Sequence, residues 1–201
     1  MSTVALHACC GPCLIEPLDA LLSAHDVTIV YANPNIHPLS EYRRRRDVLL
    51  EYAAGRGIEV VEVPYDPAMW LEATAGLWSD PPRRCRACFD LRLKLTADVA
   101  KARGLRALAT TLTVSPYQDP DAVREAAQSA AAAAGLAYAG EDYRDRYPQA
   151  TRRSRELGMY RQNYCGCLLS EIEAERDRER RRQERRARRG HERSSSLPGQ
   201  V

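Results

Sequence analysis

Short apolar runs alternate along the chain with longer stretches in which apolar residues recur at helical spacing. The runs have the length and the β-branched content of buried strands. Strands are predicted at residues 3–8, 27–32, 58–63 and 106–111. Helices are predicted at residues 14–24, 40–57, 66–77, 85–104 and 119–135, and a final long helix is predicted to start near Cys167. This alternation indicates an α/β fold with a mainly parallel sheet.

The composition indicates one domain and a tail. A chain of 201 residues, 44% of them apolar, can bury a full core. We expect an α/β domain over residues 1–175 and an Arg-rich helix end with a disordered tail over residues 176–201. No window approaches the roughly 20 apolar residues of a membrane span, and no export signal opens the chain, so the sequence predicts a cytoplasmic protein without a membrane partner.

The positive charge is concentrated near the C-terminus. The net charge is only +3, yet residues 176–193 contain ten arginines. Two interpretations remain open, a solvated helix end and an arm that attracts phosphates.

Three polar segments follow predicted strands. They are "CCGPC" (residues 9–13), "NPNIHP" (33–38) and "TVSPYQD" (113–119). Because ligands bind beyond the carboxyl ends of parallel strands, these segments are expected to converge on one edge of the sheet. In the second segment, His37 could orient a substrate or donate a proton, or it could serve only as a local hydrogen-bonding residue.

The first of these segments places three of the seven cysteines within five positions. The Gly11-Pro12 pair is expected to keep a helix from starting before Cys13. Thiols at such a strand-to-helix turn lie beside the unpaired N–H groups of a helix N-terminus, which favour thiolate. The sequence therefore predicts reactive or metal-ligating cysteines here.

A second cysteine pair could complete a metal site. In "CRAC", Cys85 and Cys88 lie one helical turn apart on one face. With Cys9 and Cys10 they make four thiolates, the number that zinc or an iron–sulfur cluster requires. Structural zinc fits the spacing, whereas the adjacency of Cys9 and Cys10 favours a larger cluster.

The pair in "CGC", Cys165 and Cys167, is a separate signal. Gly166 between them supplies the flexibility to close a strained ring, and strained disulfides are easily reduced. That would suit an electron relay. Two further ligands or two inert thiols are the alternatives.

The motifs occur in the order seen in a known family. "HACCGPC", "NPNIHPLSEYRRR", "CRACFDLRL", "TTLTVSPYQD" and "SRELGMYRQNYCGCLLS" resemble the successive motifs of the QueH-type epoxyqueuosine reductases, from residue 7 to about residue 170. The resemblance implies a compact Rossmann-like domain. It also implies the last step of queuosine biosynthesis, in which two electrons remove the epoxide oxygen of epoxyqueuosine at the wobble position of tRNA.

The resemblance further implies the cofactor and the site residues. A 4Fe-4S cluster would be held by Cys9, Cys10, Cys85 and Cys88, and Cys165–Cys167 would be a redox-active disulfide. A single iron beside the cluster would be assigned to Cys13. An external electron donor would complete the reaction.

Two other functions fit parts of the sequence. One is an iron–sulfur enzyme that transfers or removes sulfur on a thiolated base. The other is a zinc-stabilised RNA-binding module with a basic tail. Neither requires "CGC", and the metal content of the protein separates the zinc module from both enzymes.

Overall fold

The structure is a computed structural model that describes residues 2–195, with side-chain surroundings as far as residue 188. It divides into two compact units, Met1–Arg161 and Gln162–Val201. The first unit contains the sheet and six helices, and the second contains the "CGC" segment and one long helix.

The first unit is built on a single parallel sheet. Its strands are β1 (Ser2–His7), β2 (His25–Tyr31), β3 (Val60–Glu62), β4 (Ala107–Thr110) and β5 (Ala137–Tyr138). The strand order is β3-β2-β1-β4-β5, and every neighbouring pair is parallel. The predicted α/β fold with a parallel sheet is therefore confirmed.

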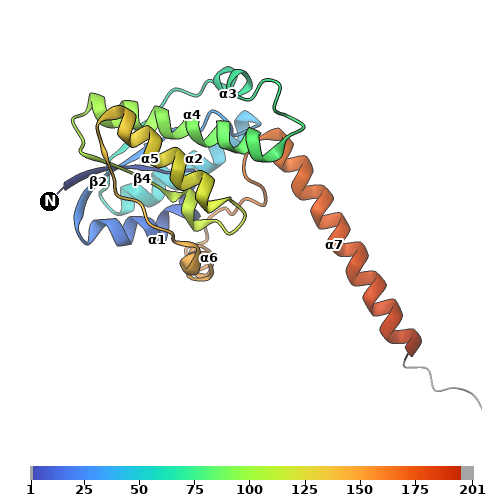
Figure 1. Ribbon diagram of the computed structural model, residues 1–201. Helices are drawn as coiled ribbons and strands as arrows, with labels where there is room; N and C mark the ends of the chain where they lie inside the picture. The colour runs from blue at the N-terminus through green and yellow to red at the C-terminus, as the bar shows by residue number, and fades with distance from the viewer. Residues whose placement is uncertain (1, 196–201) are drawn as a thin grey trace, which may run out of the picture. The chain divides into compact units, whose positions relative to one another are not determined.

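Helices connect the strands and cover the sheet. They are α1 (Gly11–Leu22), α2 (Leu39–Gly55), α3 (Pro67–Ala73), α4 (Pro81–Ala102), α5 (Pro120–Ala134) and α6 (Tyr147–Glu156), and α7 (Leu168–Ser195) belongs to the second unit. Two short 3-10 helices are η1 (Thr111–Val114) and η2 (Arg144–Arg146). Figure 1 shows the order of these elements along the chain.

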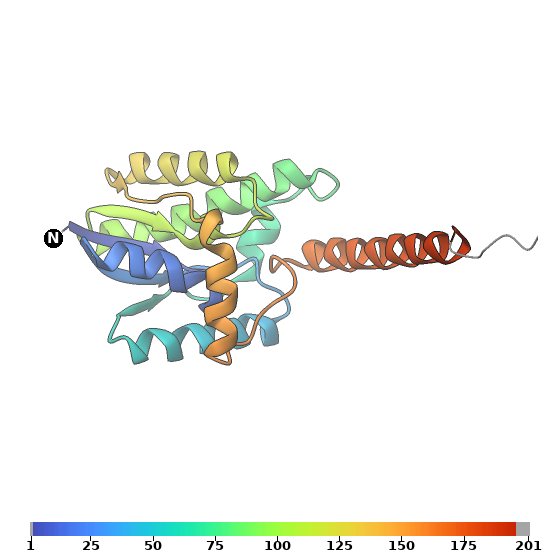
Figure 2. The same cartoon turned by 90° about the horizontal axis from the view of Figure 1, so that it is seen from below.

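The central strand separates two apolar layers. Side chains alternate between the two faces of a strand, and in β1 Val4 and Leu6 join the core that contains α1 and α2. Ala5 points the other way and packs in a cluster with Ala100 of α4. The sheet thus lies between α1 and α2 on one face and α4 and α5 on the other (Figure 2).

The carboxyl ends of β1, β2 and β4 lie at one edge because these strands are parallel neighbours. Two contacts join the segments that follow them. The Asn33 side chain donates to the carbonyl of Ala8 at 2.8 Å, and the backbone N–H of Cys9 donates to the Thr111 hydroxyl at 3.4 Å. The chain segments that follow these three strands thus meet at this edge, although the contact after β4 is made by Thr111 of η1 and not by residues 113–119.

The start of α1 differs from the sequence prediction. The helix begins at Gly11, with Pro12 in its first turn, so the Gly-Pro pair opens the helix and does not delay it. Proline is accepted there because the first N–H groups of a helix have no intrahelical partner and its fixed φ already suits the helix. Cys13 is therefore a residue of the first turn.

Other boundaries also differ. Helix α4 begins at Pro81, four residues before the predicted start, because Asp80 caps it by accepting from the Arg83 N–H at 3.2 Å. Asp119 caps α5 by accepting from the backbone N–H groups of Asp121 and Ala122. Strand β5 and helix α6 were not predicted, since a two-residue strand and a mostly polar ten-residue helix give weak patterns.

In the second unit, α7 starts next to Cys167, as predicted, and runs to Ser195. The helix therefore extends far into the segment 176–201, for which a helix end and a disordered tail were expected, and residues 196–201 lie outside the described part of the chain. Among the described residues, no helix is long and apolar enough to cross a membrane.

Candidate metal centre

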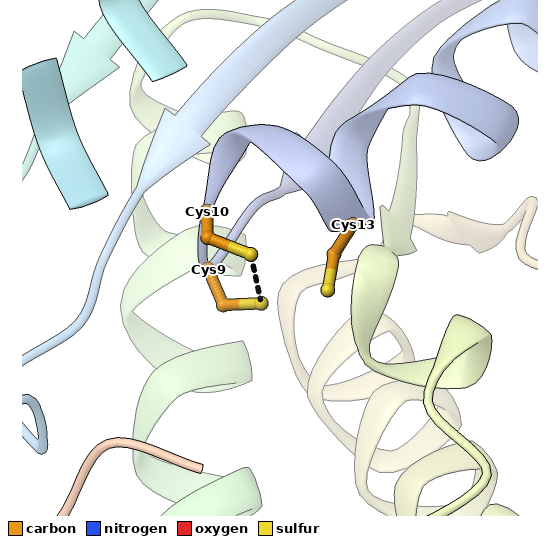
Figure 3. Close-up of side chains that lie close together, drawn as sticks. All are labelled: Cys9, Cys10 and Cys13. Carbon is orange, nitrogen blue, oxygen red and sulfur yellow. Dashed lines mark hydrogen bonds between the residues drawn. The ribbon is translucent and has the colours of Figure 1, made fainter. Parts of the chain in front are cut away.

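Three thiols meet where β1 passes into α1 (Figure 3). The Sγ atoms of Cys9, Cys10 and Cys13 lie within 4.8 Å of one another, and no second group of three or more metal-ligating side chains occurs among the described residues. Cys9 and Cys10 are buried, and Cys13 is partly exposed. Three convergent sulfurs can bind a metal ion or part of a metal cluster.

The turn that carries these thiols is held by the neighbouring strand. The Thr111 hydroxyl donates to Cys9 Sγ at 3.8 Å, and the same hydroxyl accepts from the Cys9 N–H. At the ends of the two strands, His7 Nδ1 of β1 lies 3.0 Å from the hydroxyl of Thr110 of β4. His7 ends β1, and its pKa falls to about 3 because it is fully buried and lies near the charge of Arg92. The imidazole is therefore neutral near pH 7.

The three sulfurs differ in protonation. Hydrogen bonds from the thiols of Cys10 and Cys13 hold the pKa of Cys9 well below its ordinary value. The hydrogen bond with Cys13 lowers the pKa of Cys10, but the hydrogen bond with Cys9 and burial outweigh it and raise this pKa to about 12. Hydrogen bonds with Cys10 and Cys9 raise the pKa of Cys13. Of the three cysteines, only Cys9 is therefore expected to be a thiolate. Hydrogen bonds from the two neighbouring thiols are the main cause of its lowered pKa.

A buried arginine from α4 lies beside this thiolate. Arg92 is 1% exposed and donates a 2.6 Å hydrogen bond to the side-chain oxygen of Asn33. Its positive charge lowers the pKa of both His7 and Cys9. Arg92 was not among the residues predicted from the sequence, although it lies four residues after Cys88 and therefore on the same helix face.

A second buried arginine approaches from α2. Arg45 is 1% exposed, and its Nε lies 2.7 Å from Glu41 Oε1. Burial lowers the pKa of Arg45, but electrostatic interaction with the cysteine cluster and the hydrogen bond with Glu41 outweigh it and raise this pKa. The other oxygen of Glu41 accepts a 2.8 Å hydrogen bond from the Tyr160 hydroxyl. Two buried guanidinium groups therefore accompany the cysteine cluster.

The structure places the second predicted cysteine pair on α4. Cys88 is buried, whereas Cys85 is partly buried and packs against an apolar cluster that contains Leu112. Leu112 directly follows Thr111, which contacts Cys9. Helical geometry puts Cys88 about 6 Å along the axis from Arg92. These two cysteines are not part of the three-thiol group.

The "CGC" pair belongs to the second unit, where it forms the approach to α7. Ser170 holds this turn through three hydrogen bonds: its hydroxyl donates to the Cys167 carbonyl at 2.7 Å and accepts from the Gly166 N–H, and its own N–H donates to Cys167 Sγ at 3.3 Å. Gly166 has φ 145°, which other residues rarely adopt. No disulfide joins the two cysteines in the described structure.

The remaining predicted candidates lie outside the thiol group. His37 is half-buried, and its ring meets Trp70 edge-on with the ring centroids 5.4 Å apart. Burial lowers the His37 pKa. In the segment after β4, Tyr117 is 74% exposed and packs edge-on against Tyr147.

Comparison with known proteins identifies the family of this chain. A family model described as "Epoxyqueuosine reductase QueH" matches residues 4–173. The protein named epoxyqueuosine reductase QueH in Haemophilus influenzae is 34% identical to this chain, over 82% of this chain and 70% of its own length. The protein of that name in Thermotoga maritima is 32% identical over 86% of this chain and 92% of its own length. The protein of that name in Streptococcus pyogenes is 31% identical over 83% of this chain and 69% of its own length.

A solved structure shares the fold. It is the crystal structure of a predicted subunit of tRNA methyltransferase from Methanocaldococcus jannaschii, with a TM-score of 0.52 and 13% identity over 78% of this chain and 77% of that chain. At this identity the likeness concerns the fold alone. The match to residues 4–173 covers both predicted metal-ligand segments and the "CGC" pair. This chain therefore belongs to the epoxyqueuosine reductase QueH family.

Proposed function

We propose that this chain removes the epoxide oxygen of epoxyqueuosine in tRNA by a two-electron reduction at the site formed by the three clustered cysteines. This reaction would complete the biosynthesis of queuosine. One observation carries the proposal: three thiols converge at the ligand-binding edge of the sheet in a chain of this family. The reductase activity follows from the family, since its curated members share the name epoxyqueuosine reductase, and the enzyme is an oxidoreductase.

The cofactor that we assign to this site is a 4Fe-4S cluster on Cys9, Cys10, Cys85 and Cys88. The donor set is suitable, because all four ligands are thiols and Cys9 already favours the thiolate form that a metal requires. The position of Arg92 supports the contribution of α4, since Cys85, Cys88 and Arg92 lie on one face of that helix. When bound, the cluster would supply electrons one at a time.

Cys13 is the residue that we assign to a single adjacent iron. It lies with Cys9 and Cys10 but is more exposed than either, which suits a ligand that faces the substrate side of the site. An open coordination position on such an ion could take up the negative charge that develops on a leaving oxygen.

The two buried arginines support a negatively charged occupant. Four thiolates and their cluster carry net negative charge, and an isolated charge is costly to bury. Arg45 and Arg92 bring positive charge to the thiolates from two different helices. Arg45 also pairs with Glu41, and Arg92 also donates to the amide of Asn33.

We assign the "CGC" thiols as the two-electron store. Oxidation of Cys165 and Cys167 to a disulfide releases two electrons and two protons, and the epoxide consumes both to give a carbon–carbon double bond and water. The Gly166 backbone and the Ser170 hydrogen bonds keep the turn compact, which supports ring closure between these sulfurs. An external donor would then reduce the disulfide. His37 is a weaker candidate for the proton donor, because burial favours its neutral form.

The deciding experiment is an anaerobic assay on tRNA that contains epoxyqueuosine, with a chemical reductant and with the nucleosides identified by mass. We expect conversion to queuosine, a loss of one oxygen atom. Unchanged epoxyqueuosine with fully loaded protein would refute the proposal. A colourless protein with stoichiometric zinc and no iron would instead favour an RNA-binding module.

A further inference from the structure

The arginine-rich part of α7 is not accounted for by the family match, which ends at residue 173. From Glu173 to Ser195 the only apolar side chains are those of Ala174 and Ala187. A helix without an apolar stripe cannot bury a face against a protein core or insert into a lipid surface. Its function therefore depends on charge.

Acidic residues of α7 neutralise only part of this charge. Arg180 lies 2.9 Å from Asp177 and 3.9 Å from Glu184, and Arg182 lies 3.7 Å from Glu179. These intrahelical pairs use the acidic residues on two flanks of the helix.

Between residues 178 and 188, the face between the flanks carries arginines alone. Arg181, Arg185 and Arg188 follow the spacing i, i+4, i+7, which places them on one face. All three are exposed. Within the part of α7 whose side chains are described, none of them forms an ion pair.

We propose that Arg181, Arg185 and Arg188 form a docking face for the phosphate backbone of RNA. A row of exposed guanidinium groups complements a row of phosphates, because each group offers several N–H donors in a planar fork. The choice of RNA rests on the proposed function, whose substrate is a tRNA. Contacts of this kind attract and orient the RNA without reading its sequence.

The test compares the salt dependence of binding to unmodified tRNA, which needs no turnover. The variant Arg181→Gln/Arg185→Gln should bind more weakly at low salt. Its plot of log affinity against log salt should be shallower by about 0.7 to 0.9 for each phosphate that the variant no longer neutralises. Arg181→Lys/Arg185→Lys, which keeps the charge, should retain most of the slope.

Arg152→Gln/Arg155→Gln is the matched control, because these arginines of α6 are also exposed and form no ion pair among the described residues. It removes the same charge and should leave the slope unchanged. Equal slopes for the wild type and the α7 variant, or an equal loss in the control, would overturn the proposal. Binding is measured without reaction, so the two proposals can fail separately. If the α7 variant shows the expected shallower salt slope but the wild-type enzyme does not reduce epoxyqueuosine, only the reductase function is refuted.

Discussion

Arg92 of α4 donates a 2.6 Å hydrogen bond to the side-chain oxygen of Asn33, which follows β2. Asn33 then donates to the carbonyl of Ala8, the residue before the first cysteine of the cluster. One amide thus uses its oxygen for α4 and its nitrogen for the cysteine turn. The two proposed groups of cluster ligands are connected through it.

Replacing Asn33 with leucine should be destabilising. The change removes both hydrogen bonds and leaves the buried Ala8 carbonyl without this donor, so we expect a loss of about 1–3 kcal/mol in the free energy of unfolding. Urea denaturation under anaerobic conditions measures it.

Asn35→Leu is the matched control in the same segment. Asn35 is 1% exposed, and neither of its amide atoms has a hydrogen-bond partner among the described residues. Because a buried amide without partners is unfavourable, leucine should leave the stability unchanged or raise it. If Asn35→Leu were as damaging as Asn33→Leu, the Asn33 contacts could not explain the loss.

Single serine substitutions test the cluster ligands. Protein prepared without oxygen should be brown and contain iron and acid-labile sulfide. Changing Cys9, Cys10, Cys85 or Cys88 to serine should bleach the protein or leave a damaged cluster, because each change removes one thiolate ligand. Iron and sulfide analysis provides the measurement. Full iron and sulfide in all four variants would exclude the assignment.

Substitutions in "CGC" should separate electron storage from ligation. Cys165→Ser and Cys167→Ser should keep their iron and sulfide but lose turnover, since neither variant can close the disulfide. Thiol counting should find two extra thiols in the wild type after mild reduction, and no such change in either variant. Loss of the cluster would make these cysteines ligands, and undiminished turnover with the natural donor would leave them without a role.

An ion-pair network predicts how stability depends on pH. Arg153 contacts both Glu16 and Asp19 at 2.8 Å, and Arg56 contacts the other oxygen of Asp19. Burial raises the pKa of Asp19, but hydrogen bonds from Arg153 and Arg56 outweigh it and the net pKa lies below the ordinary value. The stabilisation is therefore present above the ordinary carboxyl pKa and disappears as the pH falls through the lowered one.

Arg153→Gln should cost about 1 kcal/mol near neutral pH. The difference from wild type should shrink in acid, as Asp19 becomes protonated. Arg152→Gln, at the exposed neighbouring position, should show no such pH-dependent difference in urea denaturation. A deficit that stayed constant down to the acid transition would assign the effect to packing of the Arg153 side chain.

Much of the fold could be predicted because buried parallel strands are short, apolar and regularly separated by helices. This pattern located β1, β2, β3 and β4 and the edge at which their loops meet. It missed β5, since a strand of two residues has no measurable period. The start of α1 was wrong because proline is compatible with a first turn, which periodicity alone does not reveal.

The cysteines could be found from their spacing, but their surroundings could not. Arg45 appeared in the sequence as one of four consecutive arginines, and only the packing of α2 makes it the buried one of the four. The pairing of Asn33 with Arg92 joins residues 59 positions apart. Such contacts depend on the three-dimensional arrangement of strands and helices.

The parallel sheet leaves its opposite edge unused by this chemistry. The connections that enter β3 and β4, around Gly57 and Gly104, are exposed turns at the amino ends of those strands. A peptide tag inserted at either turn would be attached at the edge opposite the thiols. Immobilised through either tag, the protein would keep the thiol edge of the sheet facing the solution, where a large substrate could reach it.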